Sequence, residues 1–102
     1  MEGEKRVWTR QPQEQEGDYW FSGKGLMTAG INADLHQLEI KQILDDLYSF
    51  IEEKQGVDYL QVYTSNKGDK IFIIDQLSKS MIESKRWKEE DNHFTILFAH
   101  EY

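Results

Sequence analysis

The side chains best suited to hold a metal ion gather near the C-terminus of the chain. They are His93, His100 and Glu101, while the remaining histidine, His36, lies far upstream. Side chains alternate between the two faces of a strand, and positions 93 and 100 are an odd number of residues apart. On one strand the two imidazoles therefore point to opposite faces and cannot share an ion. We expect surface histidines here, with no metal and no other cofactor.

Asp75 is the carboxylate that most favours acid–base chemistry, because it ends the apolar run Ile71–Ile74. Burial at such a position would raise its pKa, and groups perturbed in this way are enriched at catalytic sites. With Tyr59 and Tyr63, Asp75 could form the site of a small enzyme or ligand-binding domain, which is the alternative function. We favour a structural role, in which Asp75 ends a strand and caps the turn near Leu77. The expected protein is not an enzyme.

The pair Gly23 and Gly25 resembles part of a phosphate-binding loop. Such a loop needs its glycines to run directly into the N-terminus of a helix, whose free N–H groups then face the phosphate. The next predicted helix begins only at Leu35, and no Gly-Lys-Ser/Thr motif follows the pair. The glycines therefore predict a turn between two short strands.

A row of acidic side chains is the candidate binding site. Glu39, Asp46 and Glu53 recur every seven residues, so they stack along one line of a helix, roughly 10 Å apart. Asp45 and Glu52 flank that line. A rigid acidic row can bind a basic groove on a protein, including a groove that normally holds nucleic acid. The alternative is a helix face that is merely solvated.

The overall charge agrees with a basic partner. The chain of 102 residues has 19 acidic and 12 basic side chains and a net charge of −7, most of which lies between Asp34 and Asp58. Direct binding to nucleic acid is disfavoured, since phosphate neutralisation needs a basic face. The sequence has no cysteine and no apolar run of about 18 residues. These features predict a cytoplasmic protein that does not interact with membranes.

The acidic row lies on a long amphipathic helix predicted for residues 34–55. Asp34 is the expected N-cap, and Gly56 is the expected residue beyond the C-terminus. The apolar side chains that recur with helical spacing, and should face the core, are Leu35, Ile40, Ile43, Leu44, Leu47, Phe50 and Ile51.

The rest of the chain predicts a sheet for this helix to cover. Strands are expected at 18–22, 25–30, 57–64, 70–76 and 93–101, whereas residues 78–90 fit a short helix or a loop equally well. The four apolar residues Ile71–Ile74 predict a central strand that is covered on both faces for part of its length. The result is an α+β fold with one helix on one face of a mostly antiparallel four- to five-stranded sheet. Residues 1–17 are expected to form a flexible polar tail, and residues 18–102 the domain.

Two terminal motifs resemble a known family. Gly25–Ile31 (GLMTAGI) and Phe94–Tyr102 (FTILFAHEY) are similar to the opening and closing motifs of small bacterial proteins grouped as domain-of-unknown-function family 3768. Ile71–Gln76 resembles a strand of that family. The family's acidic, histidine-bearing segment has no counterpart, because Gln55–Leu60 stands in its place. The resemblance implies a plasmid- or phage-associated protein whose family has no assigned activity.

Together these features predict a small acidic, non-enzymatic protein-binding module from a mobile element. Its partner would be a protein with a basic surface, such as a nucleic-acid-binding host defence protein that it inhibits. A third interpretation is a homodimer, or a larger homo-oligomer, in which the exposed sheet face or the terminal strand pairs with itself.

Overall fold

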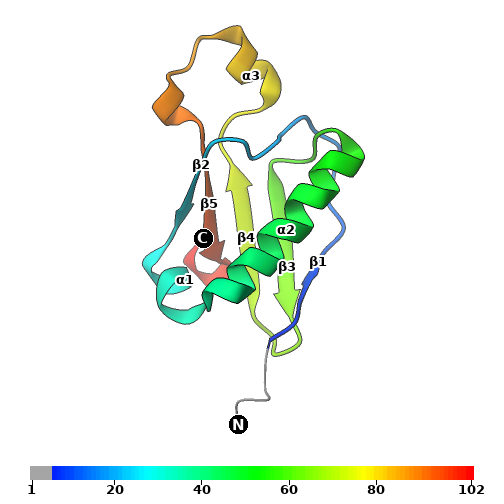
Figure 1. Cartoon of the computed structure of the whole chain (residues 1–102), viewed down its shortest axis with the longest axis vertical. Coiled ribbons are helices and arrows are strands. Elements are labelled where there is room, and N and C mark those ends of the chain that lie inside the picture. Colours follow the sequence, from blue (N-terminus) through cyan, green and yellow to red (C-terminus); the bar gives the residue numbers. More distant parts are fainter. Residues whose placement is uncertain (1–5) are drawn as a thin grey trace.

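A mixed sheet of five strands forms the centre of the part of the chain that the computed structural model describes, residues 6–102 (Figure 1). The strands are β1 (Trp8–Arg10), β2 (Lys24–Met27), β3 (Leu60–Ser65), β4 (Lys70–Asp75) and β5 (His93–Phe98). Across the sheet they lie in the order β1-β3-β4-β5-β2. All neighbours are antiparallel except β2 and β5, which run parallel. The predicted α+β class with a mostly antiparallel sheet is confirmed.

Helices lie on one side of this sheet and beyond its upper end (Figure 1). They are α1 (Ala29–Asp34), α2 (Gln37–Lys54) and α3 (Lys79–Ser84), with single 3₁₀ turns η1 (Glu89–Asp91) and η2 (Ala99–Glu101). The long helix α2 crosses the front of the sheet, and α1 lies beside it over β2 and β5. None of the helices in residues 6–102 is long and apolar enough to span a membrane.

The core lies between α2 and the face of the sheet that it covers. Leu47 is fully buried at the middle of the helix, and Ile43, Phe50 and Ile51 are buried beside it. The strands contribute the side chains that alternate onto the same face, which are Trp8, Tyr63, Ile71, Ile73, Phe94, Ile96 and Phe98. The apolar stripe read from the sequence therefore identifies the buried face of α2.

The N-terminus of α2 differs from the prediction. Asp34 ends α1, and the N-cap of α2 is His36, whose Nδ1 accepts a hydrogen bond of 3.0 Å from the backbone N–H of Leu38. The Glu39 carboxylate accepts in return from the backbone N–H of His36, at 2.9 Å. This reciprocal capping box starts the helix two residues later than expected.

The N-terminal segment also differs from the expected flexible tail. Residues 8–10 form the edge strand β1, which pairs with β3 and joins the domain whose boundary was expected at Asp18. The Trp8 indole is only 7% exposed and belongs to the core. This segment is too short to show periodicity in the sequence. It is ordered because it pairs with β3 and buries one large aromatic side chain. Residues 1–5 lie outside the described part of the chain.

Other differences lie at the ends of elements. Tyr19 makes an isolated bridge to Val57 where a strand was expected over 18–22. The strand expected over 25–30 stops at Met27, because Thr28 caps α1. The ambiguous segment 78–90 forms α3 and begins η1, and the closing strand ends at Phe98.

Replacement of Trp8 by alanine should lower the free energy of unfolding by about 3–5 kcal/mol, because it removes a buried indole from the core. Urea denaturation followed by circular dichroism measures the change. Val7→Ala is the control, because Val7 is 54% exposed next to it. A loss below about 0.5 kcal/mol for Trp8→Ala would mean that β1 does not pack on the sheet in solution.

Candidate functional site

The first residue of the predicted acidic row, Glu39, is occupied by contacts within the protein. Its carboxylate accepts two hydrogen bonds from the Arg6 guanidinium, at 2.8 and 3.0 Å, and one from the Trp8 indole N–H at 3.0 Å. Burial raises the pKa of Glu39, but these bonds and the backbone N–H of His36 outweigh it and hold the pKa below its usual value. Glu39 therefore anchors the N-terminal segment to α2.

Asp46, one heptad further along, has a similar role. Its Oδ2 accepts from Arg10 Nε at 3.0 Å and from the Tyr63 hydroxyl at 2.7 Å. Arg10 also lies over the Phe50 ring, with its guanidinium carbon 3.7 Å from the ring centroid. Both carboxylates thus bind arginines on the flank of α2 that faces β1, although the Asp46 side chain remains 48% exposed.

The remaining acidic side chains of the candidate site do lie on the surface of α2. Asp45, Glu52 and Glu53 are all exposed. Asp45 pairs with Lys41 one turn earlier, at 2.7 Å, an exposed pair of the kind that contributes little to stability. Within residues 6–102, neither the Glu52 nor the Glu53 side chain has an ion-pair partner. We call Asp45, Glu52 and Glu53 the outer acids.

Asp75 is buried and holds an unusual segment of backbone. Its Oδ2 accepts a 2.8 Å hydrogen bond from the backbone N–H of Phe21, while the Tyr48 hydroxyl donates to the Phe21 carbonyl at 2.6 Å. Phe21 has a φ of 51°, a backbone angle that residues other than glycine rarely adopt. Its fully buried ring packs edge-on against Phe94. Asp75 and Tyr48 together hold Phe21 in this conformation.

The predicted tyrosine companions of Asp75 do not gather around its carboxylate. The Tyr63 hydroxyl is bound to Asp46 on the other side of the core, and Tyr59 is 40% exposed beside Tyr19. Burial raises the pKa of Asp75 to about 6, although nearby backbone N–H groups, including that of Phe21, partly oppose this effect. The geometry assigns Asp75 to the support of a loop.

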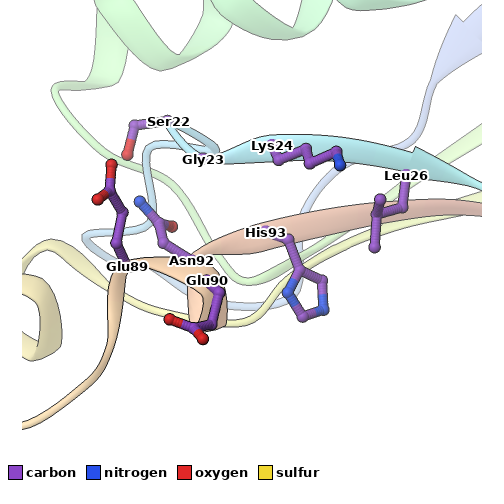
Figure 2. A pocket seen from close by; sticks show the side chains of 8 residues that line it. All are labelled: Ser22, Gly23, Lys24, Leu26, Glu89, Glu90, Asn92 and His93. Carbon is purple, nitrogen blue, oxygen red and sulfur yellow. The ribbon is translucent and has the colours of Figure 1, made fainter.

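A shallow hollow of about 920 Å³ lies between β2 and η1 (Figure 2). Figure 2 shows Glu89, Glu90 and Asn92 at one end and Lys24 with His93 towards the other. Gly23 approaches Asn92 so closely that a Cβ at position 23 would lie 2.1 Å from the Asn92 carbonyl oxygen. The hollow carries both signs of charge and no set of converging donors for one ligand class.

The histidines are spread over separate elements. His36 caps α2, His93 begins β5, and His100 lies in η2, where its ring stacks on Phe98 with the centroids 5.3 Å apart. The predicted alternation along one strand does not reach His100, because the strand ends before it. Among residues 6–102, no three His, Asp or Glu side chains are grouped so that they could hold a metal ion. Glu101 accepts hydrogen bonds from Thr28 and the backbone of Phe98.

The face of the sheet opposite α2, which the sequence suggested only as a possible contact between copies of the chain, carries apolar side chains. Two rows of paired residues cross the strands, Leu26-Thr95-Ile74-Leu60 and Leu97-Phe72-Val62. The Tyr102 ring packs edge-on against Phe72, with the centroids 5.6 Å apart. We call these eight residues the open face. Six of them alternate with core residues along β3, β4 and β5. The sequence indicated this face through the continuous apolar run at positions 71 to 74.

Comparison of the chain with protein-family models, with curated proteins and with solved structures finds no match.

The stability of the protein should fall between about pH 4 and pH 6 through Asp75. Its pKa is about 6 in the folded protein and near 3.8 when unfolded, so the folded state binds more protons in this interval. The contribution of Asp75 to the free energy of unfolding is fully present below about pH 4. It is lost as the pH rises through the folded-state pKa, by on the order of 2–3 kcal/mol. Asp75→Asn keeps an acceptor for Phe21 but cannot titrate.

Urea denaturation at a series of pH values compares the two proteins. The difference between Asp75→Asn and the parent isolates this group from the other carboxylates. We expect the variant to gain stability relative to the parent as the pH rises from 4 to 7. A pH-independent difference would show that Asp75 is not buried as described.

Proposed function

We propose that this chain is a small, non-enzymatic protein-binding module that binds a protein partner with a basic surface through the outer acids. One observation carries the proposal: within the described chain, Glu52 and Glu53 have no ion-pair partner. Both lie on the exposed surface of a helix whose opposite side packs on the sheet. Leu47 and Ile51 on that opposite side are 0% and 2% exposed. The packed helix therefore fixes the backbone positions from which these acids project before any partner arrives.

Fixed charges of one sign favour association with a surface of the opposite sign. They accelerate encounter and suppress binding to other acidic surfaces, and the net charge of −7 acts in the same direction. Glu39 and Asp46 are left out of the proposed surface because their partners Arg6 and Arg10 come from the partly buried N-terminal segment, whereas the Asp45–Lys41 pair is exposed on both sides. Of the five residues predicted from the sequence, we therefore propose Asp45, Glu52 and Glu53 as the binding residues.

A basic groove that normally holds nucleic acid is the partner class we favour. An acidic helix presents carboxylates to the lysine and arginine side chains that would otherwise bind phosphates. With the resemblance to plasmid- and phage-associated proteins, this supports the proposal of a cytoplasmic, mobile-element protein that inhibits a nucleic-acid-binding host protein. That biological role rests on analogy with other small acidic proteins.

Reversal of the outer acids should abolish capture of the partner. The variant Asp45→Lys, Glu52→Lys, Glu53→Lys is immobilised beside the parent chain and exposed to bacterial lysate. The parent should retain a basic protein that the variant does not, and double-stranded DNA should compete for it. Retention should also weaken steeply above about 0.15 M salt, because exposed charges are then screened beyond about 8 Å.

In the control variant three exposed acids elsewhere, Glu83, Glu89 and Glu90, are replaced by lysine. Its net charge therefore equals that of the variant with the outer acids reversed. It should capture the partner as the parent does. Circular dichroism should show that both variants melt within a few degrees of the parent, since these side chains are exposed. Equal capture by all three proteins would refute the proposed site.

A further inference from the structure

Strand β4 is apolar on both sides, but the fold covers only one of them. Along it the side chains alternate between fully buried Ile71 and Ile73, under α2, and partly exposed Phe72 and Ile74 on the open face. The four-residue apolar run predicts cover on both sides. The second side is covered only in part. Tyr102, itself 80% exposed, packs on Phe72, residues 11–14 border Leu60 and Val62, and Leu97 is 9% exposed.

The open face is also the part of this acidic protein from which the strands exclude carboxylates. The twelve strand residues that alternate towards it include two lysines and one histidine but neither aspartate nor glutamate. They are Thr9, Lys24, Leu26, Leu60, Val62, Thr64, Lys70, Phe72, Ile74, His93, Thr95 and Leu97. The outer acids lie on the opposite side of the molecule, on α2.

We propose that a second copy of this chain covers the open face, so that two sheets pack face to face in a symmetric dimer. An isologous contact of this kind matches apolar rows with identical apolar rows and needs no other complementary surface. Stacked sheets lie about 10 Å apart, so the dimer has four layers, helix-sheet-sheet-helix. The two α2 helices are then roughly 30 Å apart, well beyond the distance at which their charges repel in physiological salt.

The charge distribution selects a second copy over the basic partner proposed above. On the open face a basic surface would meet Lys24, Lys70 and His93 of the strands, with Glu14 at the edge, whereas α2 offers it the outer acids. Contact through the α2 faces of two copies would bring like charges together. Among the two faces, the sheet is therefore the one through which acidic copies can associate.

The size of the face predicts a reversible dimer. Six-residue strands extend about 20 Å, and five strands span a similar width, so each copy offers roughly 400 Å² of flat surface. Two copies together would bury roughly 800 Å², which is below the roughly 1,200–2,000 Å² of stable specific interfaces and corresponds to a weak or transient complex. We expect dissociation in the micromolar to submillimolar range. The dimer would display two sets of outer acids in opposite directions, which is independent of whether those acids bind a partner.

Sedimentation equilibrium of the full chain between about 1 μM and 1 mM tests the proposal. The average mass of the parent should rise with concentration from the 12.1 kDa of one chain towards twice that value. Phe72→Asp and Val62→Lys each place a charge in the contact and should keep the mass at that of one chain. Leu38→Lys, at a side chain 68% exposed on α2, is the control and should dimerise as the parent does.

A cross-linking experiment covers the case in which a charged variant fails to fold. The chain has no cysteine, so Phe72→Cys and Ser49→Cys each introduce a single thiol. Because β4 is the middle strand, a two-fold axis through the open face passes close to Phe72. Oxidation should join two copies of Phe72→Cys but leave Ser49→Cys, exposed on α2, as single chains. A parent that stays at 12.1 kDa throughout, or a dimer that forms equally with Phe72→Asp, would overturn the proposal.

Discussion

One helix can cover only one face of a sheet, and this constraint decides how the described chain is organised. The apolar stripe of α2 lies on β3, β4 and β5, and the buried side chains alternate with others that point away from the helix. The outer surface of α2 is left for polar and charged residues. The opposite face of the sheet retains apolar rows that Tyr102 and residues 11–14 cover only in part. Both proposed contact surfaces follow from this arrangement.

The second determinant is the attachment of the N-terminal segment to the flank of α2. Arg6 binds Glu39, Asp34 and Asp69, and these acceptors raise the pKa of its guanidinium despite its partial burial. Arg10 binds Asp46 in the next heptad. Both arginines come from residues beside or within β1, so strand pairing and ion pairing support each other. The same contacts occupy two carboxylates that were expected to be available to a partner.

Local sequence pattern predicted the parts of the fold that depend on local spacing. Helical periodicity identified α2 and the face through which Leu47 enters the core, and runs of β-branched and aromatic residues identified β3, β4 and β5. Strand β1 was missed because three residues with one tryptophan have no detectable period. The strand forms by pairing with β3, more than fifty residues later in the sequence. The short helix α1 was missed because its N-cap, Thr28, was read as part of a strand over 25–30.

The candidate site was predictable in type but not in its members. A seven-residue spacing shows that Glu39, Asp46 and Glu53 share one line of the helix, but it does not show which way that line faces. That direction depends on Arg6, which lies 33 residues from Glu39, and on the position of β1. Likewise, the role of Asp75 depends on the positive φ of Phe21, a feature of tertiary structure.

The open face and the outer surface of α2 should respond differently to dilution, and methyl NMR spectra can distinguish them. Methyl signals of Leu60, Val62, Ile74 and Leu97 should change together between about 1 mM and 10 μM protein, as the open face becomes exposed to water. Signals of Leu38 and Ile43 on α2 should stay constant over the same range. Constant signals from the open face, or changes centred on α2, would contradict the account.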